Sequence, residues 1–339
     1  MAYESRAYAD DAGEELKTYL ITGGAGFIGS HLAEALLAAG HRVLAIDDLS
    51  TGSLHNIASF RQHPRFEITV DTIFNRALLA DLVARADAVF HLAAAVGVRL
   101  IIESPVRTIE TNVAGTELVL AAAAKTHTPV LIASSSEVYG KANKVPFSED
   151  DDLVLGNTRT GRWSYACSKA LDEFLAIAYC REKQLPAVVV RLFNTTGPRQ
   201  TGRYGMVLPT FVRQALSGRA LTVFGDGTQS RCFCDVRDVV QALMAVIEHA
   251  DAPGRVFNIG SNEEISIGEL AQRVKSLAGS TSEIVRIPYQ QAWDEQFEDM
   301  QRRVPDLTRI GELIGFEPKT RLNELITRIV EHERANGVE

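Results

Sequence analysis

The chain alternates short, nearly continuous apolar runs with longer segments in which apolar residues recur at helical spacing. The apolar runs are Thr18–Ile21, His41–Ile46, Ala88–Ala94, Val130–Ala133 and Ala187–Leu192. The segments at helical spacing, rich in strong helix formers, are Ser30–Ala39, Asn112–Ala124 and the stretch after Tyr165. Apolar runs of this kind are typical of strands that are buried on both faces of a parallel sheet. The pattern therefore predicts an α/β fold with a doubly wound parallel sheet.

A glycine-rich turn, Thr22–Gly29, lies directly between the first predicted strand and the first predicted helix. The glycines whose spacing permits a tight turn, a close approach to a pyrophosphate and close helix packing are Gly23, Gly26 and Gly29. Gly40 closes the helix as a C-terminal cap, and the next strand ends in Asp47 and Asp48. An acid at this place accepts hydrogen bonds from the adenosine ribose and repels a 2′-phosphate. This order of elements predicts a Rossmann-like domain that binds NAD rather than NADP.

Tyr165 and Lys169 are four residues apart and therefore lie on the same face of a helix. Because an ammonium favours a nearby phenolate, we expect the pKa of Tyr165 to fall toward neutrality. Such a phenolate suits the removal of a proton from a sugar hydroxyl while hydride leaves the same carbon. Alone the pair is a weak signal, since any amphipathic helix with an exposed Tyr and Lys has this spacing.

Composition narrows the classes of partner. The formal net charge is −8 without a concentrated basic patch, which argues against a nucleic-acid partner. No apolar run is long enough to span a membrane, and we expect no membrane partner. The four cysteines form no CxxC or Cys/His cluster, so we expect no metal site, reduced thiols and a cytoplasmic location. Residues 1–17 are polar and acidic, unlike a signal peptide, and we expect an N-terminal extension there.

In this order, the motifs resemble the extended short-chain dehydrogenase/reductases that act on nucleotide-sugars, the NAD-dependent epimerase/dehydratase family. The resemblance extends from Thr18 to about Leu325. The stretches that carry it are Thr22–Gly29, Asp47–Ser50, His91–Ala95, Ser134–Gly140, Tyr165 with Lys169, Arg191–Arg199 and Phe257–Ser261. So many matches in sequence order make the assignment to the family specific.

The resemblance implies that Tyr165 is the catalytic base, that Lys169 holds the nicotinamide ribose and that Ser135 bonds to the C4 oxygen of the sugar. The cofactor-binding residues that it implies are Gly23, Gly26, Phe27, Ile28, Gly29, Asp47, Asp48, Ser50, Leu92, Ala93, Ala94, Asn112, Tyr165 and Lys169. It also implies a homodimer through a four-helix bundle, built from the long helices that start near Asn112 and Tyr165.

The same resemblance implies a smaller α/β nucleotide-sugar lobe in the C-terminal third, interleaved with the sheet. The expected division assigns 18–193, with returning segments near 231–261, to the NAD-binding domain, and 194–230 and 262–339 to the lobe. The substrate-binding residues that it implies are Arg99, Ser135, Ser136, Asn194, Arg203, Val207, Phe224, Arg231 and Arg303. Asn194, Arg231 and Arg303 match positions near the sugar diphosphate, and Phe224 belongs to the segment that packs against the nucleobase.

The reactions of this family share oxidation of the sugar at C4 and differ in the fate of the 4-keto intermediate. Simple 4-epimerases usually have no acid at the position of Glu137, whereas Ser-x-Glu-Val-Tyr-Gly resembles decarboxylases and dehydratases. Ser136 stands where dTDP-glucose dehydratases have the Asp that protonates the departing hydroxyl, although dehydratases of the GDP-mannose type accept Ser there. Glu137 therefore favours a decarboxylase and leaves a 4,6-dehydratase as an alternative.

Two stretches resemble the bacterial decarboxylase domain of the aminoarabinose pathway: the Arg-Trp-x-Tyr-x-x-Ser-Lys run within Gly161–Lys169, and Arg231–Asp238. In the second, the first Arg helps catalysis near the leaving carboxylate. The loop from Ala95 to Ile101 lacks the Tyr of decarboxylases and looks more like epimerases, which leaves carboxylate recognition to Arg99 or Arg231.

We therefore expect an NAD-dependent enzyme that decarboxylates UDP-glucuronate to UDP-xylose. The expected catalytic residues are Tyr165, Lys169, Ser135, Glu137 and Arg231. The alternatives are a nucleotide-sugar 4-epimerase, a 4,6-dehydratase and a catalytically silent NAD or nucleotide-sugar sensor, because a fold does not fix a function.

Overall fold

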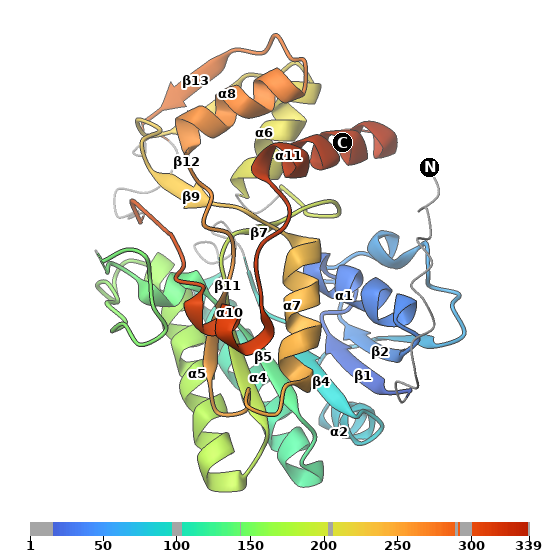
Figure 1. Cartoon of the computed structure of the whole chain (residues 1–339). Coiled ribbons are helices and arrows are strands. Elements are labelled where there is room, and N and C mark those ends of the chain that lie inside the picture. The colour runs from blue at the N-terminus through green and yellow to red at the C-terminus, as the bar shows by residue number, and fades with distance from the viewer. Residues whose placement is uncertain are drawn as a thin grey trace.

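The computed structural model describes residues 16–96, 104–142, 144–202, 206–288, 291 and 300–337. Its centre is a seven-stranded parallel sheet with the strand order β11-β6-β5-β4-β1-β2-β3 (Figure 1). The strands are β1 (Thr18–Thr22), β2 (Arg42–Asp47), β3 (Phe66–Val70), β4 (Ala88–His91), β5 (Val130–Ser135), β6 (Ala187–Leu192) and β11 (Val256–Ile259). The expected α/β fold with a doubly wound parallel sheet is confirmed, because apolar side chains fill both faces of these strands.

Helices cover both faces of the sheet. Those that pack on one face are α1 (Phe27–Ala38), α7 (Val236–Glu248) and α10 (Thr308–Ile314). Those on the other face are α2 (Arg76–Ala84), α4 (Pro105–Thr126) and α5 (Arg162–Lys183). The helix expected to open near Asn112 begins two turns earlier, at Pro105, because a proline is well placed in the first turn of a helix. Gly40, with φ +87°, ends α1 as expected.

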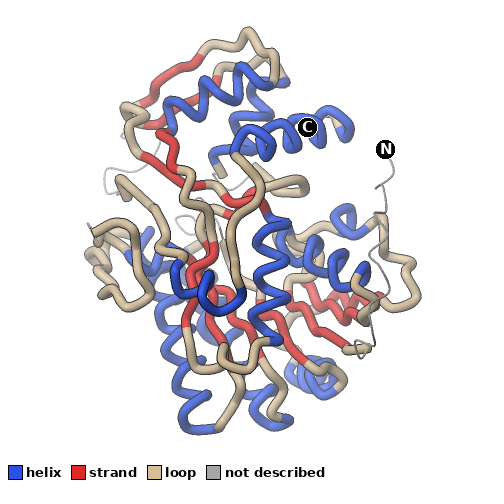
Figure 2. Tube along the Cα trace, viewed as in Figure 1, coloured by secondary structure: helices blue, strands red, loops and turns tan. Residues whose placement is uncertain are grey.

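A second group of elements forms a separate core above the sheet (Figures 1 and 2). Its elements are α6 (Val207–Leu216), β8 (Leu221–Phe224), β9 (Ser230–Cys232), β12 (Glu264–Ser266), α8 (Ile267–Leu277), β13 (Ile284–Ile287) and α11 (Leu322–Asn336). Two short pairings complete it: β8 with β13 and β9 with β12. This core is the smaller α/β lobe.

The chain passes between the sheet and the lobe several times. After β6, the short strand β7 (Thr195–Thr196) pairs with β10 (Cys234–Asp235), which leads directly back into α7. Later, α10 lies within the range assigned to the lobe, but it packs against β11 and α7 of the sheet domain. We therefore propose a lobe boundary that leaves α10 with the NAD-binding domain, while the rest of the expected division stays a prediction.

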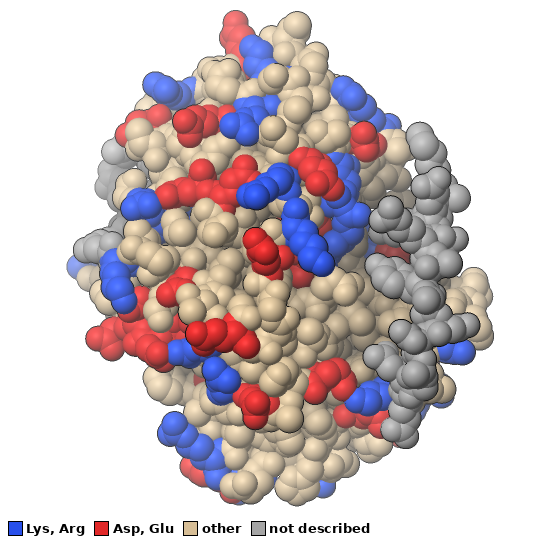
Figure 3. All heavy atoms as spheres, in the orientation of Figure 1, with Lys and Arg blue, Asp and Glu red and all other residues tan. Residues whose placement is uncertain are grey.

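Acidic and basic side chains are interspersed over the face of the molecule drawn in Figure 3. None of the helices among the described residues has the length and apolar character needed to cross a membrane.

Candidate active site

A large cleft lies between the sheet and the lobe. It begins at the carboxyl ends of β1, β4 and β5, where ligands bind in open parallel sheets, and continues to α6 and β8 of the lobe. Its volume is about 1950 Å³, larger than the roughly 300–1,000 Å³ of an ordinary small-molecule pocket. The cleft is therefore large enough for two sizeable ligands.

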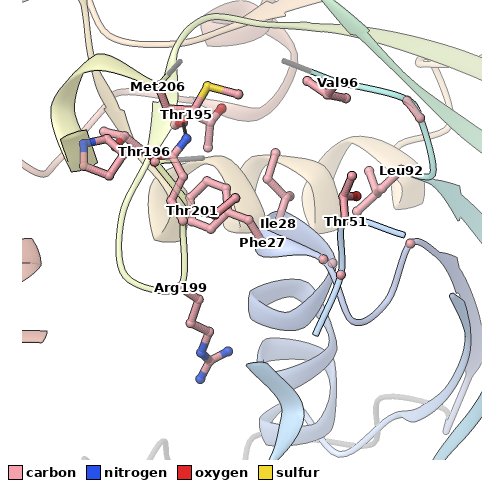
Figure 4. A pocket seen from close by; sticks show the side chains of 18 of the residues that line it. Phe27, Ile28, Thr51, Leu92, Val96, Thr195, Thr196, Arg199, Thr201 and Met206 are labelled. Atoms are coloured by element: carbon pink, nitrogen blue, oxygen red, sulfur yellow. Dashed lines mark hydrogen bonds between the residues drawn. The ribbon is translucent and has the colours of Figure 1, made fainter. Parts of the chain in front are cut away.

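The glycine loop forms the floor of the cleft at the sheet end. A Cβ at Gly29 would meet the carbonyl oxygen of Gly23 at 2.1 Å, and Gly23 itself has φ +74°. The loop therefore needs glycine both for close packing of α1 and for the left-handed turn. It leads into the N-terminus of α1, which favours an anion such as a pyrophosphate. In Figure 4, Phe27 and Ile28 at the start of α1 lie beneath residues on both sides of the cleft: Leu92 and Val96, and Thr195, Thr196 and Met206.

Asp47 ends β2 and holds the glycine loop in place. Its carboxylate accepts hydrogen bonds from the backbone N–H of Ala25 at 2.9 Å and of Leu49 at 2.8 Å. Burial raises the pKa of Asp47, against these hydrogen bonds, which lower it. Each carboxylate oxygen has room for more than one hydrogen bond, and Asp47 and Asp48 both line the cleft. Both acids thus lie in the cleft with acceptor capacity left, and their expected hydrogen bonds to a ribose stay a prediction.

A buried polar network supports the next part of the floor. The imidazole of His91 lies between the hydroxyls of Thr22 at 2.8 Å and Thr116 at 3.1 Å, and burial lowers its pKa to about 3. The Thr22 hydroxyl accepts a hydrogen bond from the backbone N–H of Ala93 at 3.1 Å. The residues that follow β4 are therefore fixed against β1 by a neutral histidine.

Asn112, expected among the cofactor-binding residues, does not line the cleft. Its side chain is fully buried between α4, α5 and the loop after β4. It accepts a hydrogen bond from the N–H of Ala95 at 2.9 Å and donates one to the hydroxyl of Ser168 at 3.1 Å. Asn112 thus lies outside the lining of the cleft and positions the 93–95 loop, and its expected contact with the cofactor stays a prediction.

Tyr165 is buried in the cleft wall with Ser135, whose hydroxyl is hydrogen-bonded to it. The ammonium of Lys169 is buried as well, and it donates to the fully buried carboxylate of Asp172 at 3.1 Å. Tyr165, Ser135 and Lys169 all line the cleft, beside the ends of β4 and β5. The structure therefore brings together three residues that the resemblance names as catalytic.

The expected fall in the pKa of Tyr165 is wrong for this arrangement. Burial raises the pKa of the phenol well above its usual value, and the nearby carboxylates of Glu137 and Asp172 raise it further. The hydrogen bond from Ser135 acts in the opposite direction. The ammonium of Lys169 is paired with Asp172, a carboxylate that itself raises the pKa of Tyr165. The Tyr/Lys spacing could not reveal this third group.

Glu137 lies at the junction of the two halves of the cleft and is bound by arginines from distant parts of the chain. Nη2 of Arg162 lies 3.2 Å from both carboxylate oxygens, and Nη1 of Arg303 donates to Oε1 at 2.5 Å. Burial alone would raise the pKa of Glu137, but the charges of Arg162, Arg303 and Arg231 lower it to about 2. Glu137 is therefore ionised at neutral pH.

Arg231 approaches this cluster from β9 of the lobe. Its Nη1 donates to the carbonyl oxygens of Ser230 at 2.7 Å and Gln301 at 3.4 Å, and the side chain is 5% exposed. Asn194, with φ +33°, donates through its amide to the carbonyl of Cys232 at 2.9 Å, which ties the end of β6 to the same strand. Val207 and Phe224 line the far end of the cleft, where the resemblance places a nucleobase.

Most of the residues expected at the site share the cleft. Those that line it are Gly23, Gly26, Phe27, Ile28, Gly29, Asp47, Asp48, Ser50, Leu92, Ala93, Ala94, Ser135, Ser136, Glu137, Tyr165, Lys169, Asn194, Val207, Phe224, Arg231 and Arg303. Arg99 and Arg203 lie outside the described residues, as does the extension up to residue 15. The roles assigned to all of these residues stay predictions.

Arg303 and Arg162 show what sequence reasoning missed. Arg303 was expected at the sugar diphosphate, but it binds Glu137, which is 166 residues earlier in the chain. Arg162 was not proposed for the site at all, although it lines the cleft with Tyr165. Its position in the sequence does contain a signal, because Arg162 lies three residues before Tyr165. Residues three apart are neighbours on the surface of a helix.

A model of the NAD dependent epimerase/dehydratase family matches residues 19–260, which span the whole sheet and the glycine loop. The chain belongs to this family. Its cofactor is accordingly NAD, as the glycine loop and the acid after β2 predict, and the family expectation is confirmed. The chemistry of the floor fits this cofactor, since the glycine loop, the start of α1 and Asp47 form a continuous cradle.

Relatives of the chain include named decarboxylases. The UDP-N-acetyl-alpha-D-glucosaminuronate decarboxylase of Bacillus cytotoxicus is 43% identical over 305 residues, which cover 89% of this chain and 93% of the relative. The UDP-glucuronic acid decarboxylase 1 of Danio rerio is 35% identical over 94% of this chain and 73% of its own. These relatives support the expected decarboxylase branch.

Solved structures of the same fold include epimerases. The UDP-glucuronic acid 4-epimerase of Bacillus cereus, solved with UDP-glucuronic acid and NAD, superimposes with a TM-score of 0.84 and 28% identity, covering 94% of this chain and 100% of that one. Enzymes named as decarboxylases and as epimerases are thus both similar to this chain. The fold alone does not distinguish the two reactions, so the side chains in the cleft must be compared.

Proposed function

We propose that this chain is an NAD-dependent decarboxylase of UDP-linked hexuronates, and that it converts UDP-glucuronate to UDP-xylose. The observation that carries the proposal is the ionised Glu137, held by arginines beside Tyr165 and Ser135. The names of the relatives described above point to the same chemistry.

The chemistry that NAD⁺ supplies when bound is the two-electron oxidation of sugar C4 and the later reduction of the same carbon. Tyr165, as phenolate, takes the proton of the C4 hydroxyl, and Ser135 holds the C4 oxygen. Because burial raises the pKa of Tyr165, the phenol must give up its own proton before it can act as the base, and the positive charge that NAD⁺ would bring to the cleft favours the phenolate. Lys169 is placed to hold the nicotinamide ribose from the same helix face.

Once C4 is a ketone, the sugar is a β-keto acid, because its carboxylate is attached to C5, next to C4. The C5–C6 bond then breaks, CO₂ leaves, and the electron pair passes into the C4 carbonyl as an enolate. Tyr165 and Ser135 stabilise the enolate oxygen, and a proton adds at C5. Glu137 carries no proton at neutral pH, so we assign to it and to Arg231 the orientation of the leaving group and of the proton that replaces it.

A second substrate is favoured by the 43% identity to an enzyme named for UDP-N-acetyl-glucosaminuronate. The two hexuronates differ at C2 and share the C4 hydroxyl and the C6 carboxylate, so the bonds that break are the same. The alternative of a 4-epimerase predicts no loss of mass and little need for Glu137.

Incubation of the purified protein with NAD⁺ and each nucleotide-sugar separately, followed by mass spectrometry, tests the proposal. Loss of the mass of CO₂ from UDP-glucuronate or its 2-acetamido analogue is the expected result. Loss of water would identify a dehydratase, and an unchanged mass with a shifted sugar NMR spectrum would identify an epimerase.

We further propose a homodimer that pairs the α4–α5 faces. Large apolar side chains are exposed there: Val106, Ile109, Leu171 and Phe174, the last of them 70% exposed. Burial of such a surface against its copy in a four-helix bundle removes it from water. Light scattering should give twice the chain mass, and Phe174→Asp should shift the measured mass toward that of the monomer.

We also propose a cytoplasmic location, since the four cysteines are free thiols, as is usual in a reducing compartment.

A further inference from the structure

Arg162 is held rigidly at the first turn of α5. Its guanidinium carbon lies 5.9 Å from the ring centroid of Trp163, within the range of a cation–π contact. The indole is itself tightly packed, because a Cβ at Gly156 would meet its Nε1 at 2.0 Å. The side chain of Arg162 is 5% exposed. It therefore presents its guanidinium to the cleft in a fixed position.

The position of Arg162 relative to Tyr165 fits a specific part of a sugar. Residues three apart on a helix are neighbours, with about 5–6 Å between their Cβ atoms. Tyr165 acts on the hydroxyl at C4, and a hexuronate carries its carboxylate on C5, the adjacent ring atom. When C4 lies at Tyr165 and C5 faces the start of α5, a long side chain one turn earlier is within reach of that carboxylate. Both residues line the cleft.

The guanidinium of Arg162 already binds a carboxylate, that of Glu137. A planar guanidinium fork matches a carboxylate, so a substrate carboxylate has the chemistry to take the same place. Glu137 would not lose all its partners in such an exchange, because Arg303 holds its Oε1 at 2.5 Å. In addition, the buried Nε of Arg303 has no hydrogen-bond partner among the described residues, so this wall of the cleft offers a further donor.

We propose that Arg162 recognises the sugar carboxylate of the substrate by exchanging Glu137 for it, while Arg303 keeps Glu137. This inference rests on the proposed function and deepens it, because it names the residue that selects a hexuronate over the corresponding hexose. It differs from the sequence-based expectation, which gave carboxylate recognition to Arg99 or Arg231.

The test measures binding without turnover. In a Tyr165→Phe background saturated with NAD⁺, calorimetry gives the dissociation constants of UDP-glucuronate and UDP-glucose. The uronate should bind more tightly, and Arg162→Gln should weaken its binding about ten- to a hundredfold, the effect of losing a charged hydrogen bond. Binding of UDP-glucose should change by about twofold or less. Arg162→Lys, which keeps the charge but not the fork, should fall between the two.

Arg302→Gln is the matched control. Arg302 is the neighbour of Arg303, but it pairs with Glu264 outside the cleft through two hydrogen bonds of 2.8 Å, and its side chain is 55% exposed. This variant should leave both dissociation constants unchanged. Unaltered binding of UDP by the Arg162 variants shows that the cleft is still folded.

A double variant separates contact with the substrate from an effect through Glu137. In a Glu137→Gln background, Arg162→Gln should still remove the preference for the uronate; no further loss there would mean that Arg162 acts only by holding Glu137, and would overturn the proposal. Survival of the preference in Arg162→Gln would overturn it too. Release of CO₂ by the unmodified protein tests the proposed function separately, since a chain that prefers the uronate without releasing CO₂ keeps the role of Arg162.

Discussion

The two ends of the cleft differ in the groups that line them. At the cofactor end, the surface consists largely of backbone, with glycines that allow close approach and one acid, Asp47, that fixes the loop. At the sugar end, the surface consists of long charged side chains, with Arg162, Arg303 and Glu137 drawn from separate segments. The first end is suited to holding a constant ligand, and the second can be changed by single substitutions.

Tyr165 joins the two ends, and its loss should have the largest effect on activity. Tyr165→Phe removes the general base, whose contribution is typically about 10²–10⁴-fold, and should reduce turnover by at least that factor. NAD should stay bound, because the glycine loop is untouched. Steady-state assays and quantification of bound nucleotide measure both quantities, and near-normal turnover in this variant would refute the role of Tyr165 as base.

Gly29→Ala should break the cofactor end alone. Its Cβ would meet backbone at 2.1 Å, so α1 must shift away from the loop, and NAD affinity should fall by about tenfold or more. Fluorescence titration with NADH measures the loss. Gly311→Ala is the control, because a Cβ there meets its nearest atom at 3.7 Å, an ordinary contact. Wild-type affinity in Gly29→Ala would contradict the assignment of this loop to the pyrophosphate.

Glu137→Gln should act on the sugar end and on the pH dependence of stability. The folded-state pKa of Glu137 is depressed to about 2, so its stabilising contribution is present above its ordinary pKa and is lost as the pH falls toward 2. Between about pH 5 and pH 3, thermal unfolding of the wild type should therefore shift more steeply than that of Glu137→Gln. Near pH 7 the variant should be destabilised by roughly 2–4 kcal/mol, and CO₂ release should fall.

Glu264→Gln separates these two effects. The pKa of Glu264 is also lowered to about 2, mainly by hydrogen bonds from Arg302, but this pair lies outside the cleft. This variant should alter acid stability without altering CO₂ release. An equal loss of activity in both variants would mean that general stability, and not the position of Glu137, controls turnover.

Asp47→Asn should produce the smallest of these effects. The amide keeps one oxygen acceptor for the loop but removes the negative charge that repels a 2′-phosphate. The preference for NAD over NADP should fall by about tenfold, with a modest loss of NAD affinity. The ratio of kcat/KM for the two cofactors measures it, and an unchanged ratio would assign the discrimination to Asp48.

The cofactor end could be predicted from the sequence because its signals are local. The strand, the glycines, the helix and Asp47 follow one another within about thirty residues, and parallel topology brings them together without further information. Asn112 is the exception, because an asparagine amide can bind a ligand or can link two helices by hydrogen bonds. Only the packing of α4 on α5 assigns it to the bridge.

At the sugar end, several of the residues could be predicted from the sequence, but the ion pairs between them could not. Glu137, Arg231 and Arg303 are identified by their surroundings in the sequence. The contact between Glu137 and Arg303, however, depends on how the segment before α10 packs against Phe147. The pKa of Tyr165 differs from the expectation for a related reason, because the fold buries the phenol and brings the carboxylates of Glu137 and Asp172 near it. Charges separated in sequence act on each other through the fold, and spacing along one helix does not report them.

The repeated passage of the chain between the sheet and the lobe has a consequence for how such enzymes diversify (Figure 1). A lobe made of one continuous segment could be exchanged for another by a single recombination event. Here α6 and β8 of the lobe come before α7 and β11 of the sheet side, and α8, β13 and α11 of the lobe come after them, so no single exchange transfers the lobe intact. Point substitutions along the cleft wall, at positions such as Arg162, are therefore a simpler route to a new substrate than exchange of the lobe.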